Sequence, residues 1–208
     1  MFPGPTGTNG VEAALKLARK VKKRNQIWAL MGCFHGMTLG ALSLTSDAGS
    51  RGGAGVCLND VTHIPAPYMF PELDTIKYME TLLTDDHSGV EKPAAIIIET
   101  VQAEGGVHVF SNEYLQGVRA LCDKYDILMI VDDIQVGCAR TGLLLVRACR
   151  YRTGYVRNVE VHRWIWYAIC SDNVQAGVRY LVTGRAQRNV PWQPAFYGCS
   201  EGRTGIYA

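Results

Sequence analysis

Residues 1–142 alternate between segments with helical apolar spacing and short, continuous apolar runs. The helical spacing predicts helices over 11–24, 73–83 and 113–125. The apolar runs predict strands over 27–31, 61–64, 94–98 and 127–131, with a Gly-rich stretch at 50–55 between the first two. Strands that alternate with helices form parallel sheets. The pattern therefore predicts an α/β fold with a mostly parallel sheet flanked by helices.

The segment ahead of the first predicted helix is a candidate phosphate site. It reads Gly4-Pro-Thr-Gly7-Thr8-Asn9, and Thr8 or Asn9 is expected to cap the helix. Backbone amides at a helix N-terminus, together with the Thr8 hydroxyl, can bind a phosphate. The spacing matches neither a P-loop nor a dinucleotide fingerprint, so a simple capped turn explains the same residues.

Side chains that could bind a ligand or take part in catalysis follow three of the predicted strands. Phe34 and His35 follow the first strand, Glu99 the third and Asp132 the fourth. Ligands of parallel sheets gather at the carboxyl ends of strands, so these residues are expected at a binding site. A carboxylate such as Asp132 can hold a cationic group there. A capping role at a turn explains Asp132 equally well, and ordinary packing explains the Phe-His pair.

The composition is that of an ordinary globular domain. The chain has 208 residues, of which 48% are hydrophobic and 19% charged, and this excludes a disordered or low-complexity protein. The longest apolar runs are far shorter than the roughly 20 residues that cross a bilayer. No signal peptide is recognisable, so a cytoplasmic protein is expected. Seven cysteines without a C-x-x-C pair disfavour a disulfide framework and a zinc site, and no metal is expected.

Charge divides the chain in two. Residues 1–142 hold 12 Lys and Arg against 16 Asp and Glu, whereas residues 143–208 hold nine Arg, no Lys and three acidic residues. Three of the four tryptophans also lie in this second part. An Arg-rich tail with interspersed aromatic residues is one way to bind nucleic acid. The basic residues are scattered singly rather than grouped on one face, so nucleic acid is the less favoured partner.

The first part of the chain resembles the class III aminotransferases, which depend on pyridoxal 5'-phosphate (PLP). The resemblance covers residues 2–142. It rests on six stretches, at 2–9, 11–19, 34–36, 51–56, 99–106 and 132–142. It implies part of the fold-type I aminotransferase large domain, incomplete at both ends. The family's segment ahead of Phe2 and its C-terminal small domain are not matched.

The resemblance assigns residues to two sides of the cofactor. It implies that Gly7 and Thr8 hold the phosphate. It also implies that Phe34 stacks on the pyridine ring and that His35 lies beside that ring.

The remaining implied residues lie after the third and fourth strands. Asp132 would pair with the ring nitrogen and keep it protonated, so that the ring can act as an electron sink. Ile134 would pack beneath the ring, and Gln135 would reach its phenolic oxygen. Glu99 and Glu104 match acidic positions on the substrate side of the family's site.

One catalytic residue of the family is missing. The family places the lysine that forms the Schiff base with PLP in a Ser-Lys-Ser motif downstream of Arg-Thr-Gly, but this chain has no lysine after Lys124. The chain is therefore expected to be inactive as written. Residues 1–142 are interpreted as a partial PLP-binding domain, and residues 143–208 as an aberrant Arg-rich tail.

A shifted reading frame explains the tail. If the frame advances by one base after residue 142, permitted codons for 159–166 can yield Ser-Lys-Ser-Ile-Gly-Gly-Tyr-Gly. The glycines that arise from Trp164 and Trp166 are forced, because tryptophan has a single codon. The missing lysine then reappears in family order. The tail is accordingly predicted to be out-of-frame translation.

The sequence resembles one branch of this family more than the others. That branch transfers an amino group from L-glutamate to L-aspartate 4-semialdehyde in ectoine biosynthesis. The implied partners are these two small molecules, and the intact family is homo-oligomeric. Two alternatives stay open. One is a non-catalytic protein that binds PLP without a lysine, and the other is nucleic-acid binding through the Arg-rich tail.

Overall fold

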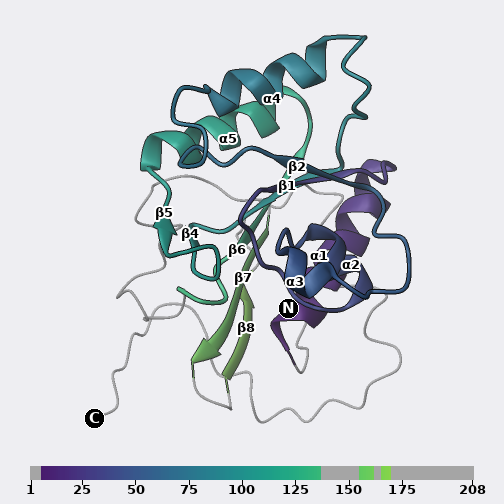
Figure 1. Ribbon diagram of the computed structural model, residues 1–208, viewed down its shortest axis with the longest axis vertical. Helices are drawn as coiled ribbons and strands as arrows, with labels where there is room; N and C mark the ends of the chain where they lie inside the picture. The colour runs from purple at the N-terminus through teal and green to yellow at the C-terminus, as the bar shows by residue number, and fades with distance from the viewer. Residues whose placement is uncertain (1–5, 137–154, 162–164, 170–208) are drawn as a thin grey trace.

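The described part of the chain is built on one six-stranded sheet (Figure 1). The computed structural model describes residues 6–136 and, for the backbone alone, residues 155–161 and 165–169. The strands are β1 (Ile27–Leu30), β2 (Val61–Ile64), β3 (Ala95–Ile98), β6 (Leu128–Asp132), β7 (Tyr155–Val161) and β8 (Ile165–Ile169). They lie in the order β2-β1-β3-β6-β7-β8, and every neighbouring pair is parallel except β7 and β8. The predicted mostly parallel α/β sheet is confirmed.

Helices connect the strands. They are α1 (Gly7–Lys22), α2 (Leu39–Leu44), α3 (Ala48–Arg51), α4 (Thr75–Thr84) and α5 (Asn112–Lys124). A short antiparallel pair, β4 (Val101–Gln102) and β5 (His108–Val109), lies between β3 and α5 in the chain. The helices and strands predicted over residues 1–142 are all present. The short elements α2, α3, β4 and β5 were not predicted, because helices of six and four residues are too short to show a helical period and strands of two residues too short to form an apolar run.

The predicted cap of the first helix is wrong. The N-cap is Thr6, whose backbone N–H and hydroxyl both donate to the side-chain oxygen of Asn9, at 3.2 and 2.7 Å. Gly7 and Thr8 therefore occupy the first turn of α1 rather than the loop ahead of it. The amides of a first turn have no partner within the helix, so this start leaves them available to a ligand.

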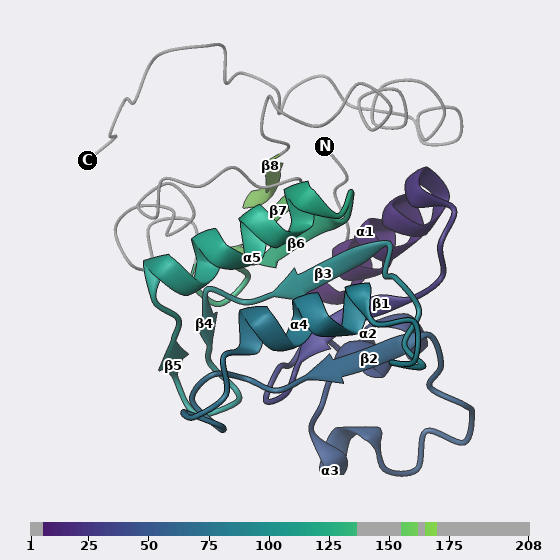
Figure 2. The ribbon, with the colours of Figure 1, turned by 90° about the horizontal axis from the view of Figure 1, so that it is seen from above.

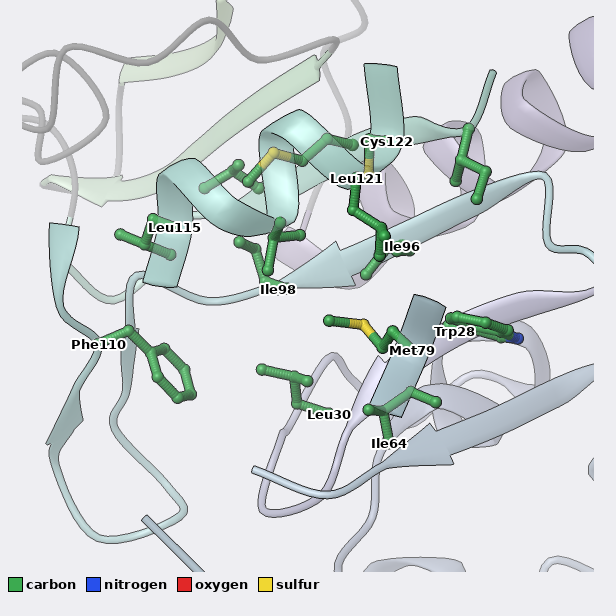
Figure 3. Close-up of a cluster of buried hydrophobic side chains, with 14 residues drawn as sticks. Trp28, Leu30, Ile64, Met79, Ile96, Ile98, Phe110, Leu115, Leu121 and Cys122 are labelled. Carbon is green, nitrogen blue, oxygen red and sulfur yellow. The ribbon is translucent and has the colours of Figure 1, made fainter. Parts of the chain in front are cut away.

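Alternate strand residues face opposite layers of helices. One set packs against α4 and α5: Trp28, Leu30, Ile96 and Ile98, which Figure 3 labels, together with Met129 and Val131. The other set, Ile27, Ala29, Ala95, Ile97 and Ile130, packs against α1 and α2. Figures 1 and 2 show α4 and α5 side by side, away from α1 and α2. Both faces of the sheet are thus covered, and this is why its strands read as continuous apolar runs.

The strand order indicates that ligands bind at the carboxyl ends of the central strands. After β1 the chain passes through α2 on one face, whereas after β3 it leads to α5 on the other face. Neighbouring strands whose connections leave to opposite faces mark the place where parallel sheets bind ligands. The carboxyl ends of β1 and β3 form such a place, and β6 ends beside β3.

The sheet continues into the Arg-rich part of the chain. Strand β7 pairs in parallel with β6, and β8 pairs with β7. The candidate lysine position, within 159–161, falls in β7, of which the backbone alone is described. The side chains of both strands, and with them the proposed nucleic-acid contacts, lie outside what the structure describes. The boundary at residue 142 and the out-of-frame origin stay predictions. Among the described helices, none has the length and apolar character needed to cross a bilayer.

Candidate functional site

The N-terminus of α1 lies against the loops that follow β1 and β6. A methyl group added at Gly7 would lie 2.6 Å from Cδ1 of Ile134, so a side chain there would displace Ile134. Gly36 has a φ of +126° and faces the Thr8 side chain closely enough to exclude any Cβ. Segments that are distant in sequence therefore converge on the first turn of α1.

A buried ion pair joins two of the predicted site residues. Nδ1 of His35 lies 2.8 Å from Oδ2 of Asp132, and both side chains are almost fully buried. Burial disfavours the imidazolium, but Cys33 and the Asp132 carboxylate more than offset this, and they raise the pKa of His35 well above its usual value. The other oxygen of Asp132 accepts the backbone N–H of Ile134 at 3.2 Å. These two bonds thus fix the orientation of the Asp132 carboxyl.

Glu99 bonds to the residue that precedes His35. Its Oε1 accepts the backbone N–H of Phe34 at 3.1 Å, so the carboxyl that follows β3 holds the loop that follows β1. Burial, opposed by His35 and supported by Asp132, raises the pKa of Glu99 to about 7. Near neutral pH this carboxyl can therefore hold or release a proton.

Substitution of Glu99 with glutamine is expected to stabilise the fold at high pH only. The folded pKa of about 7 lies above the usual value of 4.5, so the ionisation of Glu99 lowers the stability of the fold as pH rises through this window. Glutamine keeps an acceptor for Phe34 and carries no charge. Urea denaturation should show little change at pH 4 and a gain of up to about 3 kcal/mol at pH 8. An equal change at both pH values would contradict the prediction.

A second buried carboxyl adjoins the site and was not predicted to belong to it. Asp133 is fully buried, and its Oδ1 accepts a hydrogen bond from the hydroxyl of Thr100. Burial, opposed by Thr100 and supported by Asp132, raises the pKa of Asp133 to about 6. The only signal in the sequence was its place beside Asp132, where two acidic residues follow one strand.

Two of the predicted residues lie apart from this cluster. Glu104 is exposed in the turn that joins β4 and β5, and Gln135 is exposed after β6. Within the part of the chain that the structure describes, neither makes a hydrogen bond to the other predicted site residues. Phe34 and Ile134 are half-buried, and each is held through its backbone N–H by a site carboxylate.

The cluster is suited to a cationic, ring-shaped ligand with an anionic end. Three carboxyls are buried in this part of the structure, Glu99, Asp132 and Asp133, and Asp132 is the one bonded to the His35 imidazole. Their excess negative charge favours a positively charged partner. The first turn of α1 offers amides to an anion, and it contacts the same loops. Nε2 of His35 is buried without a hydrogen-bond partner in the described part of the chain.

The fold and this site are those of a class III aminotransferase, and the chain belongs to that family. The family model described as aminotransferase class III matches residues 1–150. Among individual relatives, the chain is 53% identical over 142 residues to diaminobutyrate–2-oxoglutarate transaminase from Sporosarcina pasteurii, and 54% identical to that from Bordetella parapertussis. Each match covers 68% of this chain and 33% of the relative. The chain thus spans about a third of the length of these relatives.

Solved structures give the same assignment. The taurine:2-oxoglutarate aminotransferase of Bifidobacterium kashiwanohense, solved with PLP and glutamate, shares 27% identity with a TM-score of 0.66 over 74% of this chain and 37% of its own. Lysine aminotransferase from M. tuberculosis shares 28% identity with a TM-score of 0.64 over 75% of this chain and 40% of its own. A transaminase from the marine bacterium Virgibacillus has a TM-score of 0.74 at 22% identity over 87% of this chain and 43% of its own, and shows the fold alone.

The residues present fit the cofactor of this family, PLP. Its pyridine nitrogen, when protonated, is the cation that the buried carboxylates favour, and its phosphate is the anion that the first turn of α1 favours. The tight contacts at Gly7 and Gly36 bring these two ends of the site together. The recognition of the family from sequence is therefore confirmed.

Proposed function

We propose that the described residues form part of the PLP site of a transaminase that moves an amino group from L-glutamate to L-aspartate 4-semialdehyde. The products of this transfer are diaminobutyrate and 2-oxoglutarate, the two compounds in the name of the relatives from Sporosarcina and Bordetella. A role in ectoine biosynthesis, a cytoplasmic location and a homo-oligomeric whole protein belong to the same proposal. The observation that carries it is the buried His35–Asp132 pair beside the first turn of α1.

The proposal gives each residue a physical task. Asp132 holds a proton at the pyridine nitrogen, and His35 holds Asp132 in place by the 2.8 Å hydrogen bond. Bound PLP supplies an electron sink for the charge left when an amino acid loses its α-proton.

The other residues bind and orient the cofactor. The amides of Gly7 and Thr8 hold the phosphate from the first turn of α1. Phe34 and Ile134 would hold the pyridine ring from two loops, and Gln135 would bind its phenolic oxygen.

The substrate side is assigned to the two glutamates. Glu99, with a pKa of about 7, can exchange a proton near the reacting carbon. Glu104, exposed in the turn between β4 and β5, is the outer acidic residue toward the substrates.

One observation favours a second function. No lysine follows Lys124 in this sequence, so the family's covalent link to PLP has no residue to form it. A non-catalytic protein that binds PLP reversibly would need only the contacts described above.

Equilibrium dialysis tests cofactor binding, which both candidate functions require. Pyridoxamine 5'-phosphate (PMP) is the better probe, because it lacks the aldehyde that reacts with surface lysines. We expect one saturable site per chain, complete release on dialysis, and binding at least about tenfold weaker for pyridoxamine, which lacks the phosphate. Equal affinity for both compounds, or no saturable site, would exclude the proposed cofactor site.

A further inference from the structure

A short segment at the end of α2 holds the loop that carries Phe34 and His35. We propose that residues 44–46 form a clamp that positions this ring-binding loop, residues 33–36, and that Thr45 is its central positioning residue. The inference rests on the proposed function, because the loop is taken to contact PLP. Thr45 itself belongs to no motif that the sequence singled out.

Thr45 ties the loop to the end of α2 through one hydroxyl. Its Oγ1 accepts the backbone N–H of His35 at 2.9 Å and lies within donating distance of the carbonyl of Gly36, at 3.0 Å. The residue is fully buried, so water cannot replace these bonds. A buried amide that loses its acceptor carries the full desolvation penalty, and the loop would shift to relieve it.

The neighbours of Thr45 hold the remaining position of the loop. The backbone N–H and the hydroxyl of Ser46 both donate to the carbonyl of Cys33, at 3.0 and 3.2 Å. In return, the thiol of Cys33 donates to the carbonyl of Leu44 at 3.0 Å. Phe34 is held from the other side by Glu99. Every residue of the ring-binding loop is therefore bonded to the clamp or to a site carboxyl.

The clamp is itself held by two basic side chains. Nη1 of Arg51 donates to the carbonyl of Thr45 at 2.9 Å and to those of Ser43 and Leu42 at 3.0 and 3.2 Å. Nε2 of His63 donates to the carbonyl of Leu44 at 2.8 Å. These carbonyls belong to the last turn of α2 and the residue after it, where a cation also balances the helix dipole.

This arrangement gives the Arg51-Gly-Gly stretch a task in the cofactor site. Arg51 contacts no predicted cofactor residue, but it fixes the carbonyl of Thr45, and Thr45 fixes His35. The hydrogen bond from His35 to Asp132 depends on the placement of the loop, because a displacement of a few tenths of an ångström would lengthen it. Thr45 and Arg51 are therefore positioning residues that act through His35 and Phe34.

The test compares three substitutions of buried threonines in the 208-residue chain. Thr45→Val removes the hydroxyl at constant shape, Thr45→Ser keeps it, and Thr75→Val removes another buried hydroxyl, which has no hydrogen-bond partner in the described residues. PMP affinity is measured by equilibrium dialysis, and the absorption band of bound PMP reports the surroundings of the ring. We expect Thr45→Val to bind PMP about tenfold more weakly with a shifted band. Thr45→Ser and Thr75→Val should stay within about twofold of the unsubstituted chain.

Each other outcome decides against the proposal. Unchanged binding by a folded Thr45→Val chain would overturn it, and so would binding by Thr45→Ser that is as weak as that of Thr45→Val. If Thr45→Val does not fold, Arg51→Met replaces it, since Arg51 is half-buried. A loss of about threefold then supports the clamp, and unchanged affinity overturns it. Failure of the unsubstituted chain to bind PMP would instead overturn the proposed function, and this inference with it.

Discussion

No glutamate-dependent amino transfer above background is expected from the 208-residue chain, because the sequence has no lysine after Lys124. In the class III family a lysine beyond the Arg-Thr-Gly motif bonds covalently to PLP and moves the proton between the reacting carbons. Removal of a residue with both tasks lowers turnover by on the order of 10⁴-fold or more. The contacts at Gly7, Asp132 and Ile134 can still hold the cofactor, so binding and turnover should separate.

A chain with a restored reading frame tests this prediction. Residues 143–208 are replaced by the translation of the next frame, in which Ser-Lys-Ser can appear at 159–161. PLP is then fixed with borohydride and located by mass spectrometry. We expect fixation at that lysine in the restored chain and scattered, substoichiometric fixation in the original chain. A restored chain with this lysine changed to alanine is the control.

Sequencing the coding DNA around codon 142 tests the out-of-frame origin of the tail more simply. A next frame that reads Ser-Lys-Ser, and continues in family order, would support the out-of-frame origin of the tail. Third bases that spell no lysine there would contradict it. Reversible cofactor binding without turnover would then be the better account of this chain.

Replacement of Asp132 with asparagine is expected to lower the affinity for PMP by about 100-fold. The substitution keeps the shape and an acceptor for the N–H of Ile134, but it removes the charge that faces His35 at 2.8 Å. Loss of one partner of a buried, hydrogen-bonded charge pair removes about 3 kcal/mol of binding energy, which corresponds to this factor. Equilibrium dialysis of PMP at pH 7 measures it.

Asp133→Asn provides a matched control for this experiment. Asp133 is adjacent in sequence and equally buried, but it bonds to Thr100 rather than to His35. Affinity for PMP should change by less than about fivefold in this variant. A comparable loss in both variants would show that net charge, rather than the His35–Asp132 pair, governs binding.

The His35–Asp132 pair should also change how the stability of the fold depends on pH. The folded pKa of His35 is raised, so its contribution to stability is present below the unfolded value of 6.5 and is lost as pH rises through the folded pKa. In Asp132→Asn this contribution should be smaller, because His35 keeps Cys33 but loses the carboxylate that also favours its imidazolium. The stability difference between the two chains should therefore shrink toward high pH.

The sequence predicted the fold because its long elements follow strong periods. Strand β2 was placed at its observed bounds, and β1, β3 and β6 within one residue at either end. The start of α1 was placed too late, since Thr6, Thr8 and Asn9 are all suitable caps and only the bonds from Thr6 to Asn9 select among them. The helix α2 was missed because contacts from Arg51 and Glu12, rather than a long apolar period, hold its two ends.

The sequence by itself determined the α/β pattern, the family and the types of residue in the cofactor site, because these follow from apolar periodicity and from motifs of adjacent residues. The tertiary structure alone decided which of those residues meet. It paired His35 with Asp132 across 97 positions and Phe34 with Glu99 across 65. It also showed that Thr45 holds the loop. Such contacts depend on the order of strands in the sheet, and no local pattern in the chain records that order.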